Sequence, residues 1–151
     1  MTKPSTMLGW AIAIAFLLVG AVRVGVVLFP LQLGDTNWEV AAFGELASIY
    51  AVPTLGPVLL GFLAAQRGVP GGALFASLYS ALLAVVVTLG GAFLALDVPV
   101  VLQATRGGQV VHTQMRLLVG KSIILSAVYG LTMWFMAAYF AKAFVRLRRV
   151  R

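Results

Sequence analysis

Few side chains in this 151-residue chain could carry out acid–base or nucleophilic chemistry. The sequence contains one histidine, His112, no cysteine and four acidic residues. A serine-type hydrolase would need a hydroxyl, a histidine and a carboxylate together. The available set is Ser122 or Thr113 with His112 and Asp97. Nothing in the spacing orders these groups beside one another, so we expect that the protein is not an enzyme.

The sequence also has few residues that could bind a metal ion or a haem. A zinc site needs several N, S or O ligands close together, and a membrane cytochrome usually needs paired axial histidines. With one histidine and no cysteine, the sequence provides neither set, and it excludes disulfides and thiolate metal sites. We therefore predict no metal site and no cofactor. Apolar grooves and backbone carbonyls can hold pigments or lipids, and that alternative stays open.

Most of the chain consists of long apolar stretches. Hydrophobic residues make up 62% of the sequence and charged residues 10%, whereas about 25% of a soluble domain is charged. Four stretches have about the 20 residues that cross a bilayer as a helix, and they lie at about 8–29, 46–66, 73–96 and 117–140. The sequence therefore predicts an all-α polytopic membrane protein. We expect a single domain over residues 1–151, folded as a bundle of four transmembrane helices.

Arg23 is the one charge inside the first stretch. The apolar run continues beyond it to residue 29 without a small-residue cleavage site, so we interpret the run as a span and not as a cleaved signal peptide. A charge in hydrocarbon costs about 2.5–3.5 kcal/mol unless it snorkels or finds a partner. Glu45, at the start of the second stretch, is the best-placed counter-ion, and we predict an Arg23–Glu45 ion pair. The pair either ties two helices together or belongs to an ion, substrate or partner site.

The segment after the first stretch carries strong turn and capping signals. Pro30 ends the first helix. The polar residues that follow can cap a new helix at interface depth, and they are Asp35, Thr36 and Asn37, with Trp38 directly after them. Apolar residues then recur at helical spacing at Val40, Phe43 and Leu46. We predict a short interfacial helix that lies along the membrane surface.

Two prolines stand four residues apart near the start of the second span. Pro53 and Pro57 flank Gly56, and each proline lacks the N–H that a helix interior requires. We expect a helix kink that frees carbonyl groups. This kink serves helix packing or lines a cavity.

Small residues recur every three or four positions in the last two spans. They are Ser77, Ala81, Ala84, Thr88 and Gly91 in the third span, and Ser122, Ser126 and Gly130 in the fourth. Such faces let helix backbones approach closely in lipid, where packing and hydroxyl hydrogen bonds drive association. We predict that the two faces meet each other, or that one of them is presented to a partner protein.

A polar connection of about 20 residues, 97–116, joins these two spans. Gly107 and Gly108 form a turn signal, and the flanking β-branched residues would allow a β-hairpin. An isolated two-stranded hairpin is marginally stable, so we favour helical extensions that reverse at the two glycines. The polar and cationic side chains of this connection are either solvated or dock a partner or an acidic glycan.

The charges are distributed unevenly and predict the topology. The net charge is +7, and the residues after the last span include Lys142, Arg146, Arg148, Arg149 and Arg151. Cytoplasmic flanks of membrane proteins carry an excess of Lys and Arg. We therefore predict a basic cytoplasmic tail, 141–151, that anchors to lipid headgroups, and no nucleic-acid binding. Because the number of spans is even, we predict that the N-terminus is cytoplasmic as well. The predicted location is a bacterial inner membrane.

The first half of the chain resembles the HpsJ-like small membrane proteins. The resemblance rests on Pro30-Leu-Gln-Leu, on Trp38-Glu, and on Pro53-Thr-Leu-Gly-Pro-Val-Leu-Leu, and it covers about the first 65 residues. It implies an association with secreted polysaccharide and gliding motility. The family supplies no established catalytic residues to carry over.

The sequence thus favours a non-catalytic accessory, assembly or stabilising subunit of a larger integral membrane complex. Small size, little mass outside the membrane and small-residue helix faces suit that role. The expected partners are the lipid bilayer and other integral membrane subunits, or further copies of this chain. The alternatives are a component of polysaccharide export or surface motility, and a small-molecule or lipid transporter that uses Arg23 and the Pro53–Pro57 kink.

Overall fold

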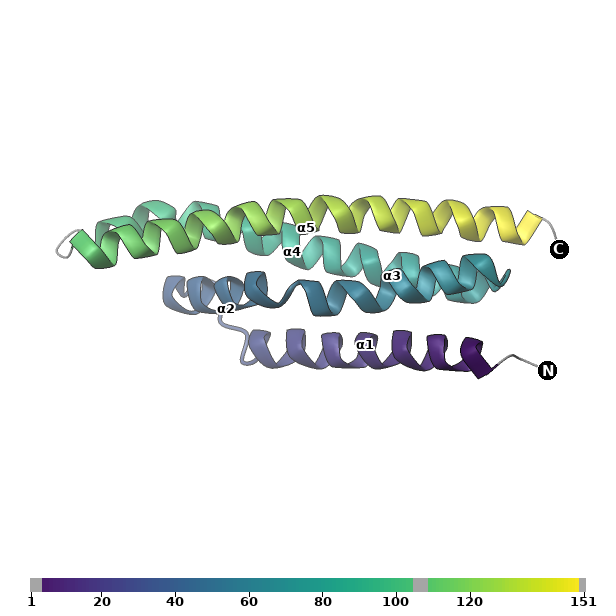
Figure 1. The fold of residues 1–151 in the computed structure, drawn as a ribbon. Coiled ribbons are helices and arrows are strands. Elements are labelled where there is room, and N and C mark those ends of the chain that lie inside the picture. The colour runs from purple at the N-terminus through teal and green to yellow at the C-terminus, as the bar shows by residue number, and fades with distance from the viewer. Residues whose placement is uncertain (1–3, 105–108, 150–151) are drawn as a thin grey trace.

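The computed structural model describes residues 4–104 and 109–149, and every regular element in these ranges is an α-helix. The helices are α1 (Pro4–Leu28), α2 (Thr36–Ile49), α3 (Ala51–Gln66), α4 (Pro70–Ala104) and α5 (Gln109–Arg149) (Figure 1). They run side by side as one elongated bundle. The start of α1 and the end of α5 lie at one end of the bundle, which we call the terminal end (Figure 1). The end of α4 and the start of α5 lie at the opposite end, which we call the hairpin end.

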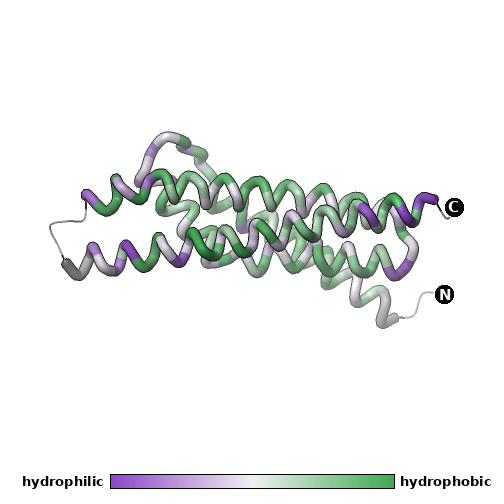
Figure 2. Tube along the Cα trace, turned by 90° about the horizontal axis from the view of Figure 1, so that it is seen from above, coloured by the Kyte–Doolittle hydropathy of each residue, from purple (hydrophilic) through white to green (hydrophobic). Residues whose placement is uncertain are grey.

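Three helices are individually long and apolar enough to cross a membrane: α1, α4 and α5. Helices α2 and α3 satisfy the same criterion together, as a pair bent by 49°. The described residues therefore hold three helices that could span a membrane, or four such segments when the bent pair counts as one broken span. Figure 2 shows hydrophobic residues along the middle of the bundle and hydrophilic residues gathered toward its two ends. Many large apolar side chains are exposed on the helices, among them Val22, Leu82 and Leu131, as expected for surfaces that face lipid.

Helices α4 and α5 form the most extensive helix–helix interface of the bundle, and α1 packs mainly on α3. At about 1.5 Å per residue, the 35 residues of α4 and the 41 of α5 extend about 52 Å and 61 Å. Both lengths exceed the roughly 30 Å of a bilayer's hydrocarbon core. The helices therefore overrun the predicted spans 73–96 and 117–140. Residues 97–104 and 109–116 continue as helix, which confirms helical extensions over a β-hairpin. Gly107 and Gly108 lie outside the described residues.

The capping prediction for α2 is confirmed at Asp35. Its side-chain carboxylate accepts hydrogen bonds from the backbone N–H groups of Asn37 (2.9 Å) and Trp38 (3.4 Å). These donors have no partner within the helix, so the cap fixes where α2 begins. Trp38 is half-buried, and its ring packs edge-on against Phe43.

The apolar face of α2 packs into the protein, and the membrane-surface position of this helix stays a prediction. Phe43 and Leu46 are buried in a core cluster with Val87 and Leu94 of α4. The ring of Phe43 rests on Gly90, whose missing side chain makes room for it, and stacks with Phe93 at 6.0 Å. Burial in this cluster holds α2 against α4 and α5, in line with the bundle rather than across it (Figure 1).

The bend in the second span lies at Tyr50, ahead of both prolines. Residue 46, the predicted start of this span, is part of α2, and α3 begins only at Ala51. Pro53 occupies the first turn of α3, where a missing N–H costs little, and Pro57 lies within the helix. The chain therefore turns just before the first proline and then continues as a helix through both.

Candidate functional site

A concave surface with apolar walls lies at the hairpin end, between α2, α4 and α5. It encloses about 670 Å³. We call it the hairpin groove, and its lining residues are Thr36, Asn37, Val40, Ala41, Gly44 and Glu45 of α2, Val100, Val101 and Ala104 of α4, and Met115 and Leu118 of α5. Val100 and Leu118 are 53% and 50% exposed. Three helices thus present apolar side chains that nothing within the described chain covers.

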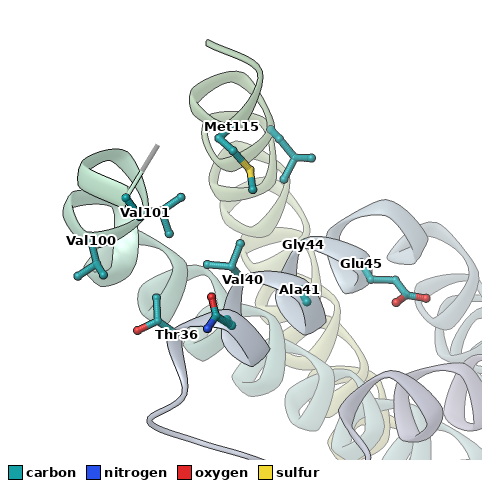
Figure 3. A pocket seen from close by; sticks show the side chains of 11 residues that line it. Thr36, Val40, Ala41, Gly44, Glu45, Val100, Val101 and Met115 are labelled. Carbon is teal, nitrogen blue, oxygen red and sulfur yellow. The ribbon is translucent and has the colours of Figure 1, made fainter. Parts of the chain in front are cut away.

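Figure 3 shows how the groove is built. Val40 points from α2 into the space between Val101 and Met115, and Thr36 lies beneath Val100. Glu45 marks the edge of the groove, and its carboxylate points away from Val100 and Val101 (Figure 3). Gly44 keeps the wall open, because a Cβ atom at this position would only touch Leu118 at 3.8 Å. The groove therefore suits an apolar occupant with a polar group near Thr36, Asn37 or Glu45.

Behind the groove, two carboxyl groups lie next to each other. Glu39 of α2 is only 5% exposed, and its Oε1 accepts a hydrogen bond of 2.7 Å from the Gly34 backbone N–H. Asp97 of α4 lies close to the Glu39 carboxyl, and its buried Oδ2 has no hydrogen-bond partner in the structure. Two carboxylates cannot bond to each other unless one holds a proton. We call Glu39 and Asp97 the acidic pair.

The local sequence does not predict the acidic pair. The two residues are far apart in the chain, and only the packing of α2 on α4 brings them together. The one available signal was the helical spacing that puts Glu39 one turn before Phe43, on the buried face of α2.

Arg23 and Glu45 are not brought together. Both side chains are exposed, on α1 and α2 respectively, and no ion pair joins them in the part of the chain that the structure describes. Arg23 lies on a helix whose surface is largely exposed, where a long side chain can reach a polar boundary by snorkelling. A role for this pair stays a prediction.

The small-residue faces of α4 and α5 lie against each other. Ser77 Oγ donates a 2.8 Å hydrogen bond to the Ala137 carbonyl across the helix pair. A Cβ atom on Gly91 would lie 2.8 Å from Ser126 Cβ, and one on Gly130 would lie 3.1 Å from Thr88 Oγ1. Ser126, Ser122 and Ala84 are buried, whereas Ala81 is half-buried. Ser126 also meets the Tyr50 hydroxyl at 3.3 Å, which links this face to the bend between α2 and α3.

The proline-rich start of α3 packs on α1. A Cβ atom on Gly56 would lie 2.6 Å from Leu17 Cα, and one on Gly20 would lie 2.5 Å from Pro53 Cα. Pro53 and Pro57 are both fully buried. These residues bring the two backbones into contact, which agrees with the packing role that the sequence analysis left open for them.

At the terminal end, the basic residues Lys142, Arg146, Arg148 and Arg149 are exposed on the last turns of α5. Arg151 lies outside the described residues. His112 lines a separate hollow at the hairpin end together with Arg116. In the described ranges, no three His, Asp or Glu side chains gather closely enough to hold a metal ion.

Comparison with known proteins yields no match to any family model, to any curated protein or to any solved structure.

Proposed function

We propose that the protein is a non-catalytic accessory, assembly or stabilising subunit of a larger integral membrane complex. The hairpin groove is the surface that docks a partner subunit in this proposal. The observation that carries the proposal is the exposure of apolar side chains on three helices around one groove. Exposed apolar patches rimmed by polar residues are typical of protein–protein interaction sites.

The length of the helices supports the same proposal. Helices α4 and α5 are longer than a bilayer is thick, and Figure 1 shows the end of α4 and the start of α5 extending past α2 at the hairpin end. In the proposed arrangement the hairpin end is the part that extends beyond the hydrocarbon, so that lipid tails do not cover Val100 there. An apolar helix or loop from a partner subunit is the occupant that would bury this wall.

The topology that we propose has four spans, with α2 and α3 forming one broken span. Both termini are cytoplasmic in a bacterial inner membrane. Support comes from the basic residues that gather at the terminal end, since cytoplasmic flanks carry the Lys and Arg excess. No cofactor is part of this proposal.

The test is purification of the native protein in mild detergent, followed by mass spectrometry and an absorption spectrum of what accompanies it. We expect stoichiometric co-purification with a larger membrane complex. The variant Gly44→Trp fills the groove from α2 and should abolish co-purification. Gly71→Trp is the matched control, because a side chain there meets nothing within 4 Å. A wild-type protein that purifies alone, or a Gly44→Trp variant that keeps its partner, would contradict the proposal.

Transport is a second candidate, and a specific observation favours it. A broken span and a buried carboxyl near its start, here Glu39, are features found around transporter sites. Substitution of Arg23 separates the two functions. A transporter should lose flux in proteoliposomes while it still assembles, whereas an accessory subunit should lose only association or stability. Retained association with lost flux would favour transport.

A role in polysaccharide export or surface motility is the proposal that follows from the HpsJ-like resemblance. It concerns the identity of the complex and not the mode of docking. Co-purified proteins of an export or motility machine would support it.

A further inference from the structure

A second groove lies at the terminal end, between the last turns of α3 and α5. It encloses about 740 Å³. Its apolar wall includes Phe62 of α3 and Tyr139, Ala143 and Leu147 of α5, and its polar wall includes Lys142 and Arg146. We call it the basic groove. Apolar and cationic residues are therefore segregated within one hollow at the end of the bundle.

The apolar wall is held in place by packed aromatic rings. Phe62, Tyr139 and Phe140 contact one another with ring centroids 5.5–5.7 Å apart. Phe140 is fully buried, and its ring packs directly on Gly61 of α3. Phe62 and Tyr139 keep 39% and 43% of their surface exposed toward the surroundings. The wall is thus preformed and accessible, as a binding surface for an acyl chain requires.

The cationic wall has no acidic partner in the groove. Lys142 and Arg146 are four residues apart, which places them on the same face of α5. They also line a neighbouring hollow with Arg149. All four acidic side chains of the sequence, Asp35, Glu39, Glu45 and Asp97, belong to the α2 region and the last turns of α4, at the hairpin end. No acidic side chain of the sequence therefore lies in the basic groove, which leaves its two cationic side chains accessible to an anion from outside the chain.

We propose that the basic groove binds an anionic glycerophospholipid. The phosphate of its headgroup pairs with Lys142 and Arg146, and its acyl chains lie against Phe62 and Tyr139. This assignment follows from charge complementarity combined with an adjoining aromatic wall at the end of a membrane bundle. It does not rest on the proposed function, because it concerns the opposite end of the molecule from the hairpin groove.

The test is native mass spectrometry of the purified protein titrated with phosphatidylglycerol, or with phosphatidylcholine of the same acyl chains. We expect saturable binding of phosphatidylglycerol and clearly weaker binding of phosphatidylcholine. Arg146→Gln and Lys142→Gln should each lower the affinity for phosphatidylglycerol about fivefold, because one basic residue near a lipid surface contributes about that factor to binding. The matched control Arg148→Gln removes the same charge from another face of α5 and should change binding by less than about twofold.

A second variant tests the groove without changing its charge. Ala143→Trp fills the hollow between Phe62 and Lys142 and should abolish the saturable component. Equal weakening by Arg148→Gln and Arg146→Gln would overturn the proposal, because it would indicate unspecific attraction to the basic tail. Equal binding of phosphatidylcholine would overturn it as well. Displacement of the lipid by millimolar inorganic phosphate would show that the site binds free anions and would also contradict it.

Discussion

At the residue scale, the packing of α2 on α4 brings the two carboxyl groups of the acidic pair together, and they repel each other when both are charged. Glu39 is nearly inaccessible to water, and Asp97 Oδ2 is buried without a donor. Like charges that approach within a bundle repel more strongly than they do in water, since the local dielectric constant is lower. The Gly34 N–H stabilises only one oxygen of Glu39. The pair therefore lowers the stability of the folded protein unless one carboxyl holds a proton.

Replacing either carboxyl by its amide should relieve this repulsion. The amide of Glu39→Gln can donate to Asp97 while its oxygen still accepts from Gly34, and Asp97→Asn can donate to Glu39 in the same way. We expect each single variant to raise the free energy of unfolding by about 1 kcal/mol. The double variant should gain less than the sum, because both changes remove the same repulsion. Thermal unfolding in detergent measures the stability changes of the two single variants and of the double variant.

Lower melting temperatures for both single variants would contradict this account of the pair. As a control, Glu45→Gln changes an exposed carboxylate on the same helix and should leave the melting temperature nearly unchanged.

At the residue scale, the sequence predicts what local chemistry determines and misses what packing determines. The Asp35 cap was predictable, because a capping side chain acts on N–H groups two and three residues away. The acidic pair and the Tyr50–Ser126 contact were not, since each joins residues that are distant in the chain. The lining of the hairpin groove was missed for the same reason.

At the element scale, helix α1 depends on two glycine contacts for its place in the bundle. Gly20 and Gly56 let the backbones of α1 and α3 touch at Pro53 and Leu17. In lipid, no hydrophobic force compensates for a lost contact between two apolar helices, so close packing must supply the association. The contact atoms are backbone atoms, which cannot move aside as a flexible side chain would.

Alanine at either glycine should therefore weaken the attachment of α1. We expect Gly20→Ala and Gly56→Ala each to lower the free energy of unfolding by about 1–3 kcal/mol, the usual cost of overpacking. Gly25→Ala is the matched control on α1, because its new Cβ meets nothing within 4 Å. It should be neutral or gain up to about 1 kcal/mol from helix propensity. Unfolding in mixed micelles measures all three, and an equal effect at Gly25 would refute the contact argument.

The helices themselves could be predicted because apolar length determines them. The apolar runs predict α1, α4, α5 and the pair α2–α3. The marginal stability of an isolated β-hairpin predicts that α4 and α5 extend as helices. The position of α2 could not be predicted. Its apolar spacing fits a membrane surface as well as a core, and the core position depends on contacts with distant residues, such as that of Phe43 with Gly90 of α4.

At the scale of the whole molecule, the bent pair decides the topology. If α2 and α3 together cross the membrane, the chain crosses four times and both termini lie on the same side. If they do not cross, the three remaining spans leave the termini on opposite sides. The parallel course of α3 with α1 and α4, and the shared position of the two termini in Figure 1, favour four crossings.

Cysteine labelling can distinguish the two topologies cleanly, because the chain contains no cysteine of its own. We expect Thr2→Cys and Arg148→Cys to react with a membrane-impermeant maleimide from the same side of the membrane. Asn37→Cys, at the start of α2, should react from the other side. Labelling of positions 2 and 148 from opposite sides would refute the broken span. It would also move the basic groove and the N-terminus to different sides of the membrane, so that the basic tail could no longer orient both ends of the chain.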